Sequence, residues 1–486
     1  MKGNIYLSND TTHLSSIINL SDPSALVTDV QYSDNTVVAF VQKKSPECIC
    51  SICGSRMESK GPRVRKVNHP IFQDGRNLLI VLTSRKWHCK SCNTYHYEQF
   101  NFVEKSHQNS NLTNLIILDK MKNINNTATS IAAELNVSDT YVHYTFMQYV
   151  NLSRLHLPEV LCIDEVYMHF NKKNLYACVL LDWKSGEIVD ILPNRFTETL
   201  SRYFMSIPLE ERKTVKYLVS DMYDTYVDLA GSILPNAVAV IDCFHHTQPI
   251  IQKIQYYVTQ VQKKYVQRDR NKLKNDNSVS NRQCKTRKDS HEVYLLKKYS
   301  WLMTKNLSDI SYVPFFVEKG KYWFYLEDVE TEFMALDPNF RRIRELKEEY
   351  IHFTRDHINK PDEAAVALGE LIKLYRNCGI SMFKEFADTL YRHKTGIINS
   401  FIYLSAERSD LNSEVLHRLS NGLAEAYNNV PKDLKRVSNG VSNFDYTRNR
   451  LLWANRHNPP ILAVPRSLKQ VHSPGETRGP YKKKSD

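Results

Sequence analysis

The chain has 486 residues, a formal net charge of +12 and 42% hydrophobic residues. Its length predicts several domains, and its basic surplus favours a polyanionic partner, either nucleic acid or an acidic membrane surface. The start, "MKGNIYLSND", lacks the apolar core of a secretion signal, and runs such as "LLIVL" are too short to span a bilayer. We therefore expect a cytoplasmic protein in which ten cysteines serve metal binding before disulfides.

Residues 1–46 read as a polar N-terminal arm with some strand character around Thr36 to Gln42. Residues 47–102 follow as a predicted zinc-binding ribbon. "CSIC" and "CKSC" place Cys50 with Cys53 and Cys89 with Cys92, and four thiolates complete the tetrahedral shell that Zn²⁺ prefers. We expect this zinc to be structural, because four thiolates leave no open position for catalysis.

Two alternatives stay open for the cysteines. Cys48 could replace one of the four ligands, or the thiols could be free on the surface. His88 and His96 flank the second pair, and we interpret them as structural or DNA-facing residues.

Residues 103–156 are predicted to form a helix-turn-helix domain. Ile131, Ala132 and Leu135 give the first helix an apolar stripe, and Asn136 is a natural left-handed stop. A second helix, capped by Ser138 or Asp139, would enter a DNA major groove. The predicted base readers are Ser138, Asp139, Thr140, Tyr141 and His143. The alternative is an ordinary helical hairpin in a core.

Residues 157–261 change to short apolar runs separated by turns. Five predicted strands are "VLCIDEVYM", "LYACVLLDW", "EIVDILP", "VKYLVSDMY" and "AVAVIDCF", with helices over "TETLSRYFMSI" and "DTYVDLAGSIL". The order strand, strand, strand, helix, strand, helix, strand matches a ribonuclease-H-like sheet, in which the first and fourth strands are neighbours.

Carboxylates interrupt or end these strands. Asp164 stands inside the first strand, Asp221 ends the fourth and Asp242 ends the fifth, while Glu425 lies in a late helical stretch. Three carboxylates from distant positions suit a site for two Mg²⁺ or Mn²⁺ ions, so Asp164, Asp221 and Glu425 are the predicted catalytic ligands. Asp242, His245, Asn421 and Asn428 are predicted supporting residues. Glu165 points to the opposite face of its strand, and we expect it to pair with a Lys or Arg.

Residues 262–412 are predicted to be a basic and mostly helical insertion, residues 413–458 the second part of the catalytic core, and residues 459–486 a flexible basic tail. The run from Gln262 to Arg287 is basic and polar without an apolar period. It would line the DNA path through Lys263, Lys264, Arg268 and Arg270, or it is a solvated loop.

These motifs together resemble bacterial insertion-sequence transposases of the ISL-three family. The resemblance rests on "CSIC…RKWHCKSC", "TSIAAELNVSDTYV", "IDEVYMHFNKKNLYACVLLDWKSGEIVDILPNR", "VSDMYDTYVDLAGSILPNAVAVIDCFHH" and "SNGLAEAYNNVPKDLKRVSNGVSNFDYTRNRLL". It implies an α/β multidomain protein whose acidic triad falls on Asp164, Asp221 and Glu425. It also implies binding of double-stranded DNA at terminal inverted repeats and target DNA, strand cleavage and transfer, and a homodimer or higher oligomer on DNA near the nucleoid.

Two other hypotheses remain. A catalytically inactive or domesticated regulator would keep the zinc and helix-turn-helix modules, but the intact triad argues against it. A junction resolvase of the same fold would read DNA shape, which the N-terminal modules disfavour.

Overall fold

The computed structural model describes residues 20, 22–44, 48–73, 76–105, 107–274, 289–407 and 415–471. The chain divides into two compact units, Met1–Ser153 with Val430–Asp486, and Arg154–Asn429. The second unit is therefore inserted between two parts of the first. This division lies close to the predicted boundary at residues 156 and 157. It groups residues 430–458 with the first unit, whereas the sequence placed them with the catalytic core.

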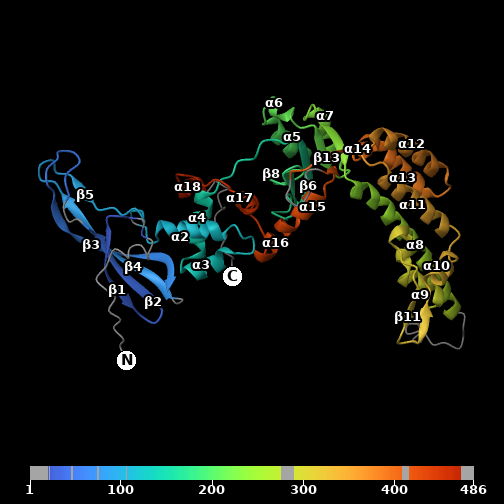
Figure 1. Cartoon of the computed structure of the whole chain (residues 1–486), viewed down its shortest axis with the longest axis horizontal. Coiled ribbons are helices and arrows are strands. Elements are labelled where there is room, and N and C mark those ends of the chain that lie inside the picture. The colour runs from blue at the N-terminus through green and yellow to red at the C-terminus, as the bar shows by residue number, and fades with distance from the viewer. Residues whose placement is uncertain are drawn as a thin grey trace, which may run out of the picture. The chain divides into compact units, whose positions relative to one another are not determined.

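The first unit begins with a five-stranded sheet (Figure 1). The strands are β1 Ala25–Tyr32, β2 Thr36–Lys43, β3 Glu58–Gln73, β4 Arg76–His88 and β5 Tyr95–Tyr97, in the order β1-β2-β4-β3 with β5 paired to β4. Val37, Ala39 and Val41 alternate into the core, and the strand expected around Thr36 is confirmed. The sequence interpretation missed β1, because only Ala25 and Val27 of that strand are fully buried.

Three helices follow the sheet: α2 Asn111–Lys120, α3 Ala128–Leu135 and α4 Asp139–Tyr149. Asn136 ends α3 in the left-handed region, with φ 51° and ψ 48°, as predicted. The Ser138 hydroxyl caps α4 by accepting a hydrogen bond from the main-chain N–H of Tyr141 at 3.1 Å. The apolar stripes of both helices are buried. The predicted pair of short helices joined by a tight turn is therefore present.

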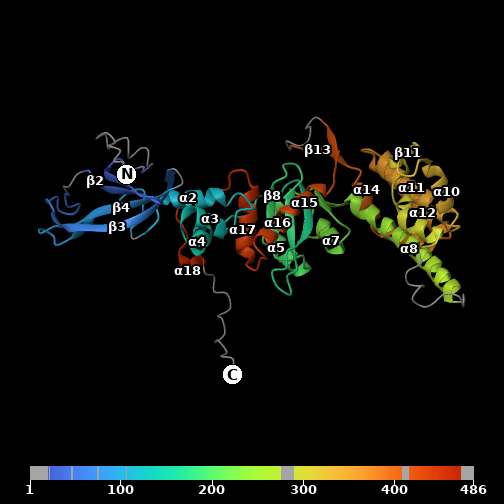
Figure 2. The same ribbon diagram turned by 90° about the horizontal axis from the view of Figure 1, so that it is seen from below.

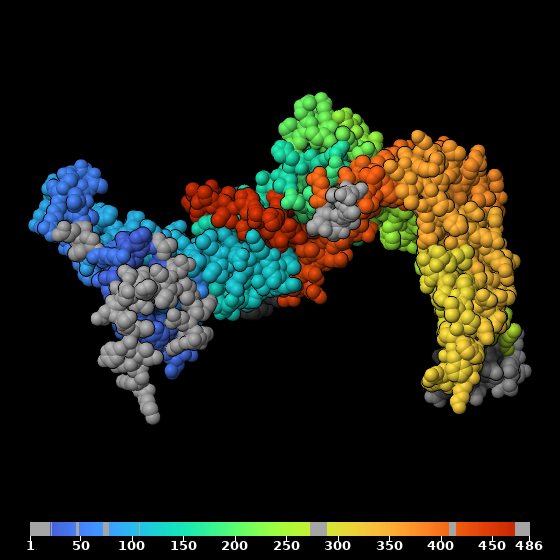
Figure 3. Space-filling model, viewed as in Figure 1, coloured from blue at the N-terminus to red at the C-terminus, as the bar shows by residue number. Residues whose placement is uncertain are grey.

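The C-terminal segment returns to this unit. It contains α17 Phe444–Asn455 and α18 Leu468–Val471, and it follows α16 Asn429–Val437, which starts at the division. In Figures 2 and 3, α17 and α18, coloured red, lie against the cyan helices α2 to α4. The indole of Trp453 donates to the carbonyl of Leu118 at 2.9 Å, and the Trp453 ring contacts Phe146. Trp453 of α17 is thus packed against α2 and α4, although more than 300 residues separate them in sequence.

The second unit contains a second five-stranded sheet. Its strands are β6 Val160–Tyr167, β7 Tyr176–Asp182, β8 Ile188–Leu192, β9 Tyr217–Ser220 and β10 Val238–Ile241, in the order β10-β9-β6-β7-β8. The strands β6, β7 and β8 are antiparallel, while β9 runs parallel to both β6 and β10. All five predicted strands are found, as are the two predicted helices, α5 Thr197–Met205 and α7 Asp224–Ser232, with the short α6 Leu209–Arg212 between them. The first and fourth strands are neighbours, as expected.

A large set of helices follows β10. The bounds are α8 Cys243–Lys274, α9 His291–Lys298, η2 Ser300–Met303, η3 Leu307–Asp309, α10 Leu326–Met334, α11 Phe340–Asp356, α12 Pro361–Asn377, α13 Ser381–Arg392 and α14 Lys394–Asn399, with a hairpin of β11 Phe315–Val317 and β12 Tyr322–Phe324. A second hairpin, β13 Tyr403–Ser405 and β14 Leu416–Arg418, leads to α15 Gly422–Tyr427. The helices from α8 to α14 share one apolar core.

Of the two alternatives for the basic run, a solvated loop does not hold for its described part. The run from Gln262 shows no apolar period, yet α8 continues through it to Lys274. The helix is held from its earlier turns, where Ile250, Ile254 and Val258 repeat every four residues and are buried in the helical core. A helix nucleated by packing can extend through polar turns, because each added residue gains one hydrogen bond without a new nucleation cost. Residues 275–288 lie outside the described part.

Candidate active site and metal centre

The register of three strands aligns three carboxylates. Val160 of β6 and Val238 of β10 both pair with Tyr217 of β9. Asp164, Asp221 and Asp242 each come four residues after these paired residues. If the register continues beyond the paired residues, Asp164 and Asp242 lie level with Asp221. The row crosses the carboxyl ends of the parallel strands, which is where open α/β sheets bind ligands.

Asp164 is buried, with only 7% of its surface exposed. Its Oδ1 accepts a hydrogen bond from the main-chain N–H of Glu165 at 2.9 Å, and its Oδ2 accepts one from the Asn428 side chain at 2.8 Å. Burial raises the pKa of Asp164 to about 7, and repulsion from Asp221 adds to the shift. The carboxylate therefore sits where a nearby cation would be strongly stabilising.

The carboxylates of Asp221 and Asp242 each accept a hydrogen bond from the main chain two residues later, which stabilises the turn after the strand. Oδ1 of Asp221 accepts from the Tyr223 main chain at 2.9 Å, and Oδ1 of Asp242 accepts from the Phe244 main chain at 2.8 Å. The other oxygen of Asp242 accepts from the main-chain N–H of Asn421 at 2.6 Å. Asp242 thus ties the end of β10 to the start of α15, where Glu425 stands.

Two asparagines fix α15 against β6. The Asn421 side chain donates to the carbonyl of Ile163 at 3.3 Å, and Asn428 also donates to the carbonyl of Glu165 at 3.2 Å. Both are buried, and their Oδ1 atoms have no hydrogen-bond partner among the described residues. Carbonyl oxygens left without donors in this way are suited to a cation or an ordered water.

Glu425 lies beside His245 of α8. Glu425 Oε1 and His245 Nε2 are 3.0 Å apart, without the directional geometry of a hydrogen bond. Within the described chain, the carboxylates and imidazoles whose ligand atoms all lie within 4.8 Å of one another are those of Asp242, His245 and Glu425. Asp164 and Asp221 are outside this close group. The structure therefore brings Glu425 next to two residues predicted as supporting, with the other two predicted ligands further along the row.

Glu165 has the basic partner that the sequence led us to expect, and a second partner that it did not. It forms an ion pair with Arg195 and accepts a hydrogen bond from the Tyr226 hydroxyl at 2.9 Å. Burial raises the pKa of Glu165, while Tyr226 and Arg195 oppose the shift. Sequence reasoning anticipated a Lys or Arg here, but it missed Tyr226, which lies 61 residues away in sequence.

The four predicted zinc ligands meet at the end of the β3–β4 ribbon. The Sγ atoms of Cys50 and Cys92 are 3.5 Å apart, those of Cys53 and Cys89 are 3.4 Å apart, and all four lie within 4.8 Å of one another. Tetrahedral Zn²⁺ with Zn–S bonds of about 2.3 Å separates its sulfurs by about 3.8 Å. The cluster is therefore a possible Cys₄ metal site.

The chemistry of these thiols also suits a cation. A hydrogen bond from Thr94, together with the main-chain N–H groups of Cys53 and Ile52, lowers the pKa of Cys50 to about 6. Although Thr94 opposes the shift, burial and the neighbouring thiols raise the pKa of Cys92 to about 11. Four thiols this close do not all ionise unless a cation lies between them. Cys48 is not in the group, and its sulfur contacts that of Met57 at 3.7 Å.

The five predicted base readers on α4 differ in their surroundings. Ser138, Asp139 and Thr140 are exposed at the start of the helix. The Tyr141 hydroxyl donates to Asn114 at 2.7 Å, and the His143 ring lies 4.3 Å from that of Tyr446. Tyr141 and His143 therefore have packing partners within their own unit.

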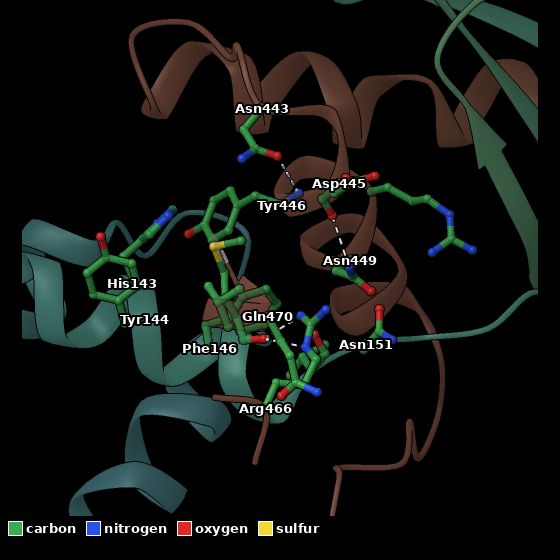
Figure 4. Close-up of a pocket in the computed structure, with 14 residues that line it drawn as sticks. His143, Tyr144, Phe146, Asn151, Asn443, Asp445, Tyr446, Asn449, Arg466 and Gln470 are labelled. Carbon is green, nitrogen blue, oxygen red and sulfur yellow. Dashed lines mark hydrogen bonds between the residues drawn. The ribbon is translucent and has the colours of Figure 1, made fainter. Parts of the chain in front are cut away.

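A cavity of about 510 Å³ lies beside α4 (Figure 4). It is bounded by α4, α17 and the segment around α18. Arg466 crosses the end of α4, where its guanidinium donates to the carbonyls of Met147 and Val150. In return, the Gln148 side chain donates to the carbonyl of Arg466 at 3.0 Å. The C-terminal segment thus caps the end of the helix that carries the predicted readers.

The predicted DNA-path residues lie in the C-terminal third of α8. Lys263, Lys264 and Arg270 are exposed, whereas Arg268 pairs with Asp269 at 2.9 Å and with Glu292 at 3.0 Å. Among the described residues, no ion pair is found for Lys263, Lys264 or Arg270. No described helix is long and apolar enough to cross a membrane.

Comparison with known proteins gives the family. Residues 161–451, more than half of the chain, match a family model of the ISL3 type that is described as a transposase. The chain is also 22% identical over 299 residues to the transposase for insertion sequence element IS1557 of Mycobacterium tuberculosis, in strains CDC 1551 / Oshkosh and ATCC 25618 / H37Rv. These alignments cover 60% of the chain, which spans 58% of the length of those relatives. The family match contains Asp164, Asp221, Asp242 and Glu425, and the chain therefore belongs to the ISL3 (ISL-three) family of insertion-sequence transposases.

Proposed function

We propose that this transposase binds the terminal inverted repeats of an insertion sequence and cuts and joins DNA through Asp164, Asp221 and Glu425. The observation that carries the proposal is the pair of carboxylates formed by Asp164 within β6 and Asp221 just after β9, with α15 tied to β6 by Asn428. A regulator without catalysis would not need an acid such as Asp164, whose pKa is raised by burial and, to a smaller extent, by repulsion from Asp221. We infer a ribonuclease-H-like core from the strand order β10-β9-β6-β7-β8 and the late helix α15.

The residues present fit divalent metal ions. Asp164, Asp221 and Glu425 offer the carboxylate oxygens that Mg²⁺ and Mn²⁺ prefer, and Asn428 has an unpaired buried carbonyl oxygen beside them. Two bound ions would neutralise the phosphate and activate water or a 3′-hydroxyl. Asn428 orients Asp164 and Asp242 anchors α15, so the protein itself supplies positioning for phosphoryl transfer.

We propose a supporting role for the remaining residues. Asp242 and His245 flank Glu425, and His245 is placed to restrain the position of that carboxylate before a metal ion binds. A structural Zn²⁺ on Cys50, Cys53, Cys89 and Cys92 would hold the two cysteine turns together.

DNA recognition is proposed at two places. Ser138, Asp139 and Thr140 at the exposed start of α4 would contact bases, and the main chain there favours phosphate. Lys263, Lys264 and Arg270 on α8 would contact the DNA backbone. Because two element ends must be processed together, we propose a dimer or a higher oligomer on DNA.

We keep the predicted division as a proposal for function: 47–102 for zinc, 103–156 for DNA recognition, 157–261 with 413–458 for catalysis, and 262–412 for the insertion. Residues 430–458 belong to the same unit as the recognition helices. In chain order, the second unit therefore continues into the first unit at both of its ends, residues 154 and 429.

Strand cleavage tests the proposal. The full chain is incubated with Mg²⁺ and a labelled duplex that carries the inverted repeat flanking its gene, and 3′-hydroxyl products and joined products are resolved on denaturing gels. We expect Asp164→Asn to lose cleavage by several orders of magnitude while still binding the duplex. Asp228→Asn, on the exposed side of α7, is the matched control and retains cleavage. Equal cleavage by Asp164→Asn and the original protein would refute the catalytic assignment.

A further inference from the structure

A basic cavity lies at the edge of the N-terminal sheet. Its volume is about 520 Å³, and its lining residues are Arg63, Arg65, Lys66, Asn68, Leu79, His107 and Gln108. None of these residues is acidic, and none has an aromatic ring other than the imidazole of His107. The cavity is therefore suited to an anion more than to a stacked base.

Arg65 forms the fixed part of this cavity. Its Nη1 donates to the carbonyls of Glu104 at 3.1 Å and His107 at 3.0 Å. The loop after β5 is thereby held against β3, the outer strand of the sheet. One nitrogen makes both bonds, and no further hydrogen bond of the guanidinium is found among the described residues, so its other N–H groups can serve a ligand.

The same loop also pairs with the edge of β3 at Asn68, three residues after Arg65. The main-chain N–H of Asn68 donates to the carbonyl of Gln108 at 2.8 Å, and the N–H of Ser110 donates to the carbonyl of Asn68 at 3.0 Å. These main-chain bonds fix the loop against β3, and Arg65 is held in place before any ligand binds.

Arg63 and Lys66 are exposed at the cavity, and no carboxylate of the described residues lies within ion-pair distance of either. Lys43 and Lys120 of the same unit, by contrast, pair with Asp22 and Glu134. Arg63 is also close enough to Arg65 that, after burial, its charge contributes to a lowered pKa of Arg65. Arg63 and Arg65 carry guanidinium groups that repel each other, and such a pair favours a shared anionic ligand.

We propose that this cavity binds the phosphate backbone of double-stranded DNA, with Arg63 and Lys66 each neutralising a phosphate beside the fixed guanidinium of Arg65. The inference rests on the proposed function, in which the ligand of this transposase is duplex DNA. It adds a contact that is independent of base sequence and that lies on the sheet. Such a contact fixes the register of a protein on DNA and carries no sequence information.

The test measures the salt dependence of binding by the full, zinc-loaded chain. Fluorescence anisotropy gives the affinity for a repeat duplex and for a scrambled duplex of equal length over a range of NaCl concentrations. Each neutralised phosphate contributes about 0.9 to the slope of log K against log salt. We expect R63Q/K66Q to reduce the slope by about 1.8 and to weaken binding to both duplexes by the same factor.

The control K360Q/K373Q removes the same charge from the exposed Lys360 and Lys373, which pair with Glu363 and Glu370. We expect it to leave the slope unchanged. R63K/K66R keeps both charges and should keep the slope, and Arg63→Gln alone should reduce it by about 0.9 if the double variant folds poorly. Zinc content and thermal unfolding show whether each variant is folded.

The outcomes separate this inference from the proposed function. If the original protein prefers the repeat and R63Q/K66Q has the slope of the control, the cavity does not bind phosphate, and repeat recognition stands. If the original protein binds both duplexes equally and R63Q/K66Q still lowers the slope, the cavity binds phosphate, and repeat recognition fails. If the original protein binds neither duplex, both proposals are wrong.

Discussion

The side-chain amide of Asn428 donates a hydrogen bond of 2.8 Å to Oδ2 of Asp164, although 264 residues separate the two in sequence. The same amide reaches the carbonyl of Glu165 at 3.2 Å. The residue that directly follows α15 thus holds both the Asp164 side chain and the main chain of β6. The position of Glu425, one turn before Asn428 on that helix, depends on these bonds.

Asn428→Ala should impair catalysis more than stability. Loss of a residue that orients a metal ligand typically costs about 10- to 100-fold in metal affinity or activity, and the lost hydrogen bonds cost about 1–3 kcal/mol. Single-turnover cleavage measured against Mg²⁺ concentration should show a lower maximal rate and a higher Mg²⁺ concentration at half-maximal rate. Asn455→Ala, which removes only a bond to Leu451 within α17, should change neither.

The affinity for Mg²⁺ should rise between about pH 6 and about pH 8. Burial raises the pKa of Asp164 from 3.8 to about 7, so the metal-free protein carries a proton there that Mg²⁺ must displace. Calorimetry in two buffers of different ionisation enthalpy should detect proton release on binding near pH 6.5, a value of about half a unit below that pKa.

The same group affects stability without metal. Between 3.8 and about 7 the folded protein holds a proton on Asp164 that the unfolded chain has lost, so this group makes the free energy of unfolding fall as pH rises through that range. Asp164→Asn should remove this part of the pH dependence. A pH profile of the variant identical to that of the original protein would show that Asp164 has an ordinary pKa.

Removal of zinc should unfold the end of the β3–β4 ribbon. Cys89 is fully buried among the four thiols, and Cys89→Ser should lose bound zinc and hydrogen-exchange protection around β5. Natively purified protein should contain one zinc per chain by elemental analysis. Cys48→Ser is the control, since Cys48 lies outside the ligand group, and zinc loss in that variant alone would reassign the ligands.

Arg450→Met should loosen the first unit. The guanidinium is 1% exposed and donates to the carbonyls of Asn123 at 2.7 Å and Asn126 at 3.1 Å, in the turn between α2 and α3. Burial lowers the pKa of Arg450 to about 10. Leaving these carbonyls unpaired should cost about 2–4 kcal/mol and speed hydrogen exchange in α3. The exposed Arg436, paired with Asp433, provides the control variant Arg436→Met.

Gly396→Ala should destabilise the second unit by about 1–3 kcal/mol. A Cβ at Gly396 of α14 would lie 2.7 Å from Cγ1 of Ile241, the last residue of β10. Gly369→Ala, in α12 with open space around it, should instead stabilise by up to about 1 kcal/mol. Thermal unfolding of both variants checks the opposite signs, and equal effects would mean that α14 does not pack closely on β10.

Local patterns in the sequence determined much of this protein. The alternation and length of apolar runs predicted the five strands of the second sheet, and the Asn136 stop and Ser138 cap marked the boundaries of two helices. The spacing of the paired cysteines predicted the Cys₄ group. These signals succeed because hydrogen bonding and side-chain direction repeat every two or 3.6 residues and depend on neighbours along the chain.

The tertiary structure decided which distant segments meet. It placed residues 430–471 with the N-terminal helices, buried Arg450 in a turn more than 300 residues earlier, continued α8 through a polar run, and set Glu425 beside Asp242 and His245. Each of these depends on packing and on the satisfaction of buried polar groups between segments far apart in the chain. Local periodicity carries no information about such pairings, because the free energy that selects them arises only when the two surfaces are in contact.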